Sequence, residues 1–164
     1  MASQETPLEA TLKGAVSGVV GTAALTAVMM GVPAIARQFG VGAAAPDAAQ
    51  PAADFAGKVA EGVLDTSVGD STKQVGGQLV HWSYGAAWGA LYGIVQSSVK
   101  LPHLLHGTIF GGIVAVVATT ALPAMRLTPP PTQQPASMSV NQALSHMVYG
   151  WVTALTFHRL SKDG

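Results

Sequence analysis

The pattern of charged and apolar residues divides the chain into long apolar stretches separated by short polar ones. Asp, Glu, Lys and Arg are absent from positions 14–36, 74–99, 101–125 and 127–158. A hydrocarbon core of ~30 Å needs about 20 apolar residues in a helix, so each stretch can hold one membrane span. Positions 16–36 also lack the polar stripe that a surface helix of a soluble bundle would show. We therefore predict an all-α polytopic membrane protein, a single domain over 1–164, with transmembrane helices at about 12–36, 77–99, 103–125 and 139–160.

The ends of these predicted spans carry residues typical of membrane interfaces. Aromatic residues lie early in the second and fourth spans and basic residues lie near the span ends: Trp82, Tyr84, Tyr149, Trp151, Lys13, Lys100, Arg126, Arg159 and Lys162. The first apolar stretch follows Glu5 and Glu9 and exceeds the core length of a signal peptide, so we expect a span rather than a cleaved leader. The basic residues closest to span ends favour both termini in the cytoplasm.

The segment between the first two spans predicts one short amphipathic helix at about 51–64. Its apolar and polar sides are formed by Phe55, Val59 and Val63 and by Asp54, Lys58, Glu61 and Asp65. Two interpretations stay open: the helix lies at the membrane interface or over helix ends, or it docks a partner. The proline-rich segment 128–135 predicts a stiff connection between the third and fourth spans.

The second and fourth spans open with the same pattern, H-x-x-Y-G, at 81–85 and 146–150. The spans before them share a Gly-x-x-x-Gly pair, at Gly14 and Gly18 and at Gly107 and Gly111. A duplicated two-helix hairpin accounts for these matches in order, with coincidence in a Gly- and Ala-rich chain as the alternative. Two copies of two spans each would be related by an approximate two-fold axis along the membrane normal.

Small residues at a spacing of four allow close helix packing in lipid. We expect such packing at Gly14, Gly18, Gly85, Gly89, Gly93, Gly107 and Gly111, either within the bundle or against a second copy. The face with Gly85, Gly89 and Gly93 should form the tightest contact.

The amino-acid composition excludes several classes of binding and catalytic function. Of 164 residues, 49% are hydrophobic and 10% charged, and eight basic residues balance eight acidic ones, which leaves no basic surface for nucleic acid. The chain has no Cys, so disulfides and thiolate metal sites are excluded. It also lacks H-E-x-x-H, P-loop and G-x-G-x-x-G motifs, and no span holds a carboxylate that could orient a catalytic base. We predict no metal site, no catalytic residues and no enzymatic activity.

The polar groups predicted inside the membrane are His81, Tyr84, His106, His146 and Tyr149. Three interpretations of the histidines stay open: hydrogen bonds between helices, a pathway for protons or small solutes, and axial ligation of a haem or chlorophyll-type pigment by His81 and His146. The first of these requires no cofactor.

Three segments carry a resemblance to a known family: Gly-Gln-Leu-Val-His-Trp at 77–82, Arg-Leu-Thr-Pro-Pro at 126–130 and Ser-His-Met-Val-Tyr-Gly-Trp at 145–151. Over about 74–162 the chain resembles the YagU-like family of small bacterial inner-membrane proteins, whose biochemical function is unassigned. Of the histidines, His146 matches the family pattern. The resemblance implies a multi-pass protein of the bacterial inner membrane with cytoplasmic termini, and it implies no substrate.

From these features we expect a non-enzymatic membrane protein, a scaffold, accessory or assembly subunit. Its partners would be the lipid bilayer and other membrane subunits or a second copy. Spans with so few polar groups should leave little room for a lined cavity. The alternatives are a small transporter, channel or proton-conducting protein that uses the histidines, and a haem- or pigment-binding protein.

Overall fold

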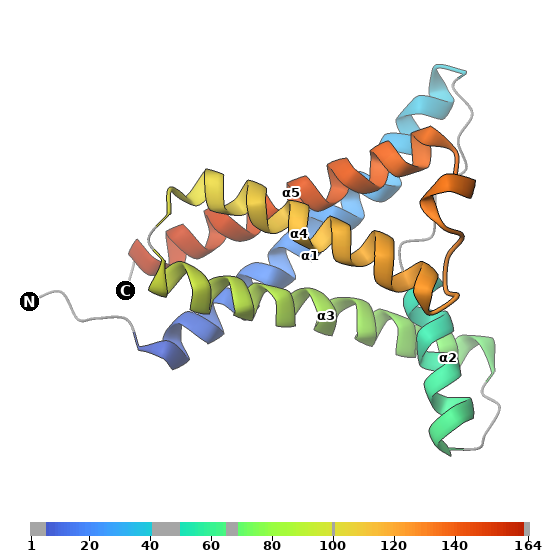
Figure 1. The fold of residues 1–164 in the computed structure, drawn as a ribbon, viewed down its shortest axis with the longest axis horizontal. Helices are drawn as coiled ribbons and strands as arrows, with labels where there is room; N and C mark the ends of the chain where they lie inside the picture. The colour runs from blue at the N-terminus through green and yellow to red at the C-terminus, as the bar shows by residue number, and fades with distance from the viewer. Residues whose placement is uncertain (1–5, 41–49, 65–68, 100, 163–164) are drawn as a thin grey trace, which may run out of the picture.

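The computed structural model describes residues 6–40, 50–64, 69–99 and 101–162, which form helices and no strand (Figure 1). The elements are α1 (Pro7–Gln38), α2 (Gln50–Leu64), α3 (Asp70–Ser98), α4 (His103–Ala124), the short 3-10 helix η1 (Pro131–Gln133) and α5 (Ala136–Lys162). The predicted all-α class is confirmed. Each predicted span falls on one long helix, α1, α3, α4 or α5, and the predicted amphipathic helix is α2.

The four long helices run side by side in alternating directions (Figure 1). α1 packs against both α3 and α5, and α5 also packs against α4, whereas α3 and α4 make few contacts with each other. α1 begins and α5 ends at the same end of the bundle, where α3 also turns into α4. α2 lies at the opposite end, against α3. The helices therefore form two antiparallel pairs, α1 with α3 and α4 with α5, joined through α1 and α5.

Local sequence signals set the helix ends. Thr6 caps α1: its hydroxyl accepts a hydrogen bond from the Glu9 N–H, and its own backbone N–H donates to the Glu9 carboxylate. The Glu9 carboxylate accepts hydrogen bonds from the Thr6 backbone N–H and from the Thr6 hydroxyl, and these two bonds, the backbone one foremost, hold the pKa of Glu9 below its usual value. Pro33 lies inside α1 and does not end it, and the helix continues to Gln38.

α4 ends soon after Pro123, in a Schellman turn. The Leu127 N–H donates to the Leu122 carbonyl at 3.0 Å and the Arg126 N–H to the Pro123 carbonyl at 2.9 Å. Arg126 has φ 56°, the left-handed conformation that this turn requires. The turn directs the chain back across the end of the bundle.

Small side chains are buried and large apolar ones are exposed on the long helices, which reverses the arrangement in a soluble helical bundle. Along α1 the buried positions are largely small residues, among them Gly14, Ser17, Gly18, Gly21 and Thr22. Large apolar side chains on all four long helices are exposed, for example Val16, Leu91, Val116 and Leu144. Larger buried side chains gather between the helix pairs, at Leu25, Tyr92, Phe110, Val114, Tyr149 and Phe157.

Two of the described helices, α1 and α4, are long and apolar enough to cross a membrane. α3 and α5 are long enough but do not reach the same apolarity. Both contain Gln, Ser and His residues, and in α5 the polar residues Asn141, Ser145 and His146 are buried. The structure thus supports two of the four predicted spans by length and composition.

Candidate functional site

Glycine residues form the crossing of α1 and α3. Gly14 and Gly18 lie directly against Gly89, with Gly85 and Gly93 one turn to either side. A Cβ atom on Gly89 would lie 2.5 Å from Gly18 Cα, a distance that no real side chain tolerates. All five glycines are buried, so this surface is occupied within the chain.

α4 and α5 cross in a similar way. Gly107 faces Gly150 and Ala154, and Gly111 faces the backbone of His146 and Gly150. A Cβ atom on Gly150 would lie 2.8 Å from Gly111 Cα. Gly150 was not among the predicted packing residues, although it closes the second H-x-x-Y-G motif.

The two crossings share a register that differs from the one the motifs predict. Gly150 meets the Gly107 carbonyl and the Gly111 Cα, and Gly89 meets the Gly14 carbonyl and the Gly18 Cα. Gly150 therefore corresponds to Gly89. The alignment of the two motifs instead pairs Gly150 with Gly85, one helical turn earlier. Gly85 instead faces Thr22.

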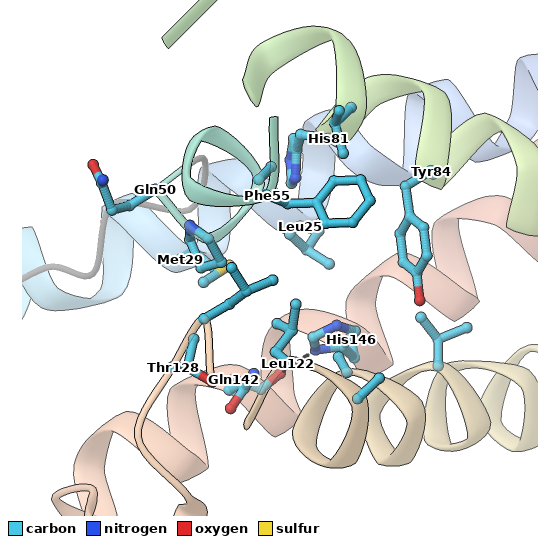
Figure 2. Close-up of a pocket in the computed structure, with 18 of the residues that line it drawn as sticks. Leu25, Met29, Gln50, Phe55, His81, Tyr84, Leu122, Thr128, Gln142 and His146 are labelled. Carbon is cyan, nitrogen blue, oxygen red and sulfur yellow. Dashed lines mark hydrogen bonds between the residues drawn. The ribbon is translucent and has the colours of Figure 1, made fainter. Parts of the chain in front are cut away.

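The two H-x-x-Y-G motifs nevertheless meet in space. His81 and Tyr84 on α3 and His146 and Tyr149 on α5 line one cavity (Figure 2). His106 lies elsewhere: its ring stacks on Tyr92 with 4.5 Å between centroids, and its Nδ1 contacts Gln96 Oε1. Four of the five predicted intramembrane polar residues thus share one site.

The cavity measures about 480 Å³, and its lining residues come from both helix pairs and from α2, so it lies between the pairs at the α2 end of the bundle. It is partly open, and α3 and α4 line opposite sides of it. The part of its wall that the described residues form is mostly apolar and contains no Asp, Glu, Lys or Arg. The expectation that the bundle leaves little room for a cavity is wrong, because α1 and α5 separate α3 from α4 and the space between them is not filled at this end.

α2 covers part of this space. Pro51 and Phe55 belong to the cavity wall, whereas Val59 on the predicted apolar side is 43% exposed. Close contact of α2 with α3 depends on Gly77, where a Cβ atom would lie 2.6 Å from Ala53 Cα. Gly77 carries no small-x-x-x-small signal in the sequence, because the residues four positions away, Lys73 and His81, are large. Val63 and Asp65 of the predicted helix faces lie outside the side chains that the structure describes.

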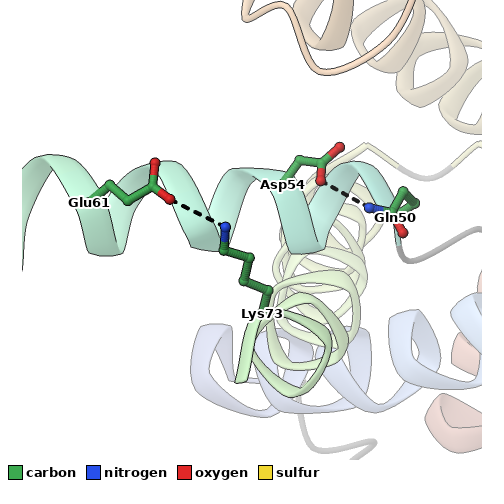
Figure 3. A network of polar contacts seen from close by, with 4 residues as sticks. All are labelled: Gln50, Asp54, Glu61 and Lys73. Carbon is green, nitrogen blue, oxygen red and sulfur yellow. Dashed lines mark hydrogen bonds and ion pairs between the residues drawn. The ribbon is translucent and has the colours of Figure 1, made fainter. Parts of the chain in front are cut away.

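Polar contacts hold α2 in place from two sides. Lys58 Nζ donates to the Met125 carbonyl at the end of α4, at 2.9 Å. Lys73 on α3 forms a 3.2 Å ion pair with Glu61, and Gln50 bonds Asp54 within α2 (Figure 3). α2 therefore packs over helix ends, as one of the two interpretations predicted.

Each cavity histidine already has one hydrogen-bonding contact. His81 Nε2 lies 3.1 Å from Thr26 Oγ1 on α1, and His146 Nδ1 lies 2.8 Å from the Gln142 carbonyl one turn earlier in α5. Ligation of a haem or pigment by these two residues stays a prediction. No group of three or more His, Cys, Asp or Glu able to hold a metal occurs in the part of the chain that the structure describes.

Comparison with known proteins finds one family. A family model with the description "Protein of unknown function (DUF1440)" matches residues 47–155. No curated protein and no solved structure matches the chain. The matched region includes α2, α3, α4 and most of α5, and so all of the cavity wall except the part formed by α1.

Proposed function

The chain belongs to the DUF1440 family of proteins of unknown function, in agreement with its YagU-like resemblance, and from this premise we propose that it is a non-enzymatic integral membrane protein with four spans. We further propose that it is an accessory or assembly subunit of the bacterial inner membrane. The observation that carries the proposal is the inverted packing, with glycine, serine and threonine inside and large apolar side chains outside.

Exposed apolar surface on every long helix supports the two additional spans. Outward-facing residues of α3 and α5 include Leu79, which is 66% exposed, and Val140, which is 58% exposed. A soluble monomer rarely exposes apolar patches on all sides, because water makes such surface unfavourable. In lipid the same surface has no cost, and close packing of small residues supplies the attraction between helices.

Partner subunits would bind to surfaces other than the glycine crossings, which are occupied within the chain. The outer face of α4 offers Ile109, Ile113 and Val116, each about half or more exposed. Large apolar side chains on a rigid helix can form a contact with a neighbouring helix in the bilayer. This face is our candidate for the contact with another subunit.

Three measurements test the proposal. Carbonate extraction of membranes should leave the protein in the pellet, and reporter fusions after residue 164 and within 41–49 should lie on opposite sides, with the C-terminus cytoplasmic. Purification in mild detergent should recover a defined partner membrane protein together with this chain. Val116→Trp on the outer face of α4 should reduce the amount of partner recovered, whereas Ser98→Trp, away from the outer face of α4, should not. A chain that stays monodisperse in water without detergent would contradict the membrane assignment.

One observation favours a second candidate, a small transporter or proton-conducting protein. His81 and His146 line the same cavity from different helices, as such a protein requires. If this candidate applies, His146→Ala abolishes uptake or proton flux in reconstituted vesicles. If the protein is an accessory subunit, the same substitution changes stability only.

A further inference from the structure

The cavity has the chemistry of a ligand site, and we propose that it binds a neutral amphiphile: a hydrocarbon chain with a hydroxyl group that donates a hydrogen bond to His146 Nε2. This inference goes beyond the accessory role, since a subunit that only packs against partners needs no cavity. It assigns both a place and a chemical class to the ligand.

The size and wall of the cavity set the class of the ligand. Its volume of about 480 Å³ lies within the range of roughly 300–1,000 Å³ typical of small-molecule sites. Leu25, Phe55, Val114 and Leu122 contribute apolar surface from α1, α2 and α4. An ionised headgroup would be desolvated here without a counter-charge, because none of the described residues that line the wall is charged. The ligand is therefore uncharged and mostly hydrocarbon.

His146 determines the polar group of the ligand. The Gln142 carbonyl can only accept, so the 2.8 Å contact places the hydrogen of the neutral ring on Nδ1. Nε2 then carries a lone pair, and no described residue donates a hydrogen bond to it. The His146 side chain is 8% exposed and lines the cavity, so this lone pair is available to a ligand there. A ligand that donates a hydrogen bond would satisfy it, whereas an ether or an alkane would not.

The positions of His146 and α2 determine where the hydroxyl group and the hydrocarbon chain of the ligand lie. His146 lies beside Leu122 and Gln142, and Tyr84 and His81 lie across the cavity from it (Figure 2). Phe55 extends from α2 over the space between them. A hydroxyl at His146 would leave the hydrocarbon chain to pack against Leu25, Phe55 and Leu122.

The experiment uses the full chain in dodecyl maltoside micelles and a long-chain alcohol with a photoreactive diazirine in its hydrocarbon chain. Labelled peptides are mapped by mass spectrometry, with unlabelled hexadecan-1-ol or its methyl ether as competitor. We expect labels on cavity residues and competition by the alcohol about three- to tenfold stronger than by the ether, the equivalent of one neutral hydrogen bond.

Variants separate the cavity from the lipid-facing surface. His146→Phe keeps a ring but removes the acceptor, so the alcohol and the ether should compete equally. Leu122→Trp should fill the cavity and reduce labelling about fivefold or more, with Leu25→Trp as a second filling variant on another helix. Leu91→Trp on the outside of α3 is the control, since Leu91 is 52% exposed and lies outside both the cavity wall and the proposed partner face, and it should leave labelling unchanged.

Equal competition by alcohol and ether in the unmodified protein would overturn the proposal. Labelling confined to outward faces, unaffected by both filling variants, would overturn it as well. Neither result bears on extraction from membranes or on copurification, so failure of the ligand assignment and failure of the proposed function are distinguishable.

Discussion

The Tyr149 hydroxyl on α5 donates a 2.7 Å hydrogen bond to the Gly85 carbonyl on α3. Both residues belong to H-x-x-Y-G motifs, and the bond joins two helices that otherwise make few contacts. Tyr149 is 2% exposed and also packs against Gly21 of α1 and Phe110 of α4. One side chain therefore touches all the other long helices.

Tyr149→Phe should destabilise the bundle while keeping its packing. The substitution removes the hydroxyl alone, and hydrogen bonds between helices in membranes contribute about 0.6 kcal/mol on average and up to roughly 2. We expect a loss of about 1 kcal/mol, measured as the free energy of unfolding in mixed micelles with increasing sodium dodecyl sulfate. Tyr84→Phe is the control, since the Tyr84 hydroxyl bonds no described residue. Equal stability of both variants would contradict the role of the Gly85 bond.

Gly89→Ala should be among the more damaging single-carbon additions. Its Cβ would lie 2.5 Å from Gly18 Cα and 2.6 Å from Gly18 N, and a helix backbone cannot yield as a flexible side chain does. Separation of α1 from α3 should cost about 1–3 kcal/mol, the usual range for overpacking. The measurement is thermal unfolding in detergent, compared with the unmodified protein.

Gly31→Ala provides the matched control on α1. No atom lies within 4 Å of a Cβ added at Gly31, and Ala is favoured over Gly inside a helix by roughly 0.5–1 kcal/mol. This variant should be neutral or more stable. If Gly89→Ala were equally harmless, the close approach of α1 and α3 would be wrong.

The helices could be predicted because charge-free stretches and their boundaries are local features of the sequence. The register of the crossings could not. Gly85, Gly89 and Gly93 recur at every turn, so a shift of one turn leaves the sequence pattern unchanged. Only the contacts with Gly14 and Gly18 in the structure identify Gly89 as the residue at the crossing. The cavity also escaped prediction, because it depends on α1 and α5 separating α3 from α4. Hydrophobic patterns do not determine which helices become neighbours.

Arg126→Gly should stabilise the protein. Arg126 holds φ 56° in the turn after α4, a conformation that costs a residue with a Cβ about 1 kcal/mol and glycine little. The Arg126 side chain is exposed, so its removal sacrifices little packing. We expect a gain of about 0.5–1 kcal/mol in the free energy of unfolding. Arg126→Ala is the control, because it removes the same charge without relieving the backbone, and it should show no gain.

Lys58→Met should release α2 from the end of α4. Lys58 Nζ donates to the Met125 carbonyl at 2.9 Å and lies 3.4 Å from the Arg126 carbonyl, so the cation stabilises carbonyl groups left without partners at a helix end. Loss of this contact should cost about 1 kcal/mol, equivalent to roughly fivefold faster exchange of the α2 amide hydrogens. Exchange measured by mass spectrometry over peptides from 50–61 tests this, with α1 as the internal reference. Lys73→Met is the control, because it removes the ion pair with Glu61. The Lys73 and Glu61 side chains are 32% and 51% exposed, so this ion pair contributes less to the stability of α2 than the Lys58 contact. Faster exchange in the Lys73 variant than in the Lys58 variant would show that α2 is held by α3 rather than by the end of α4.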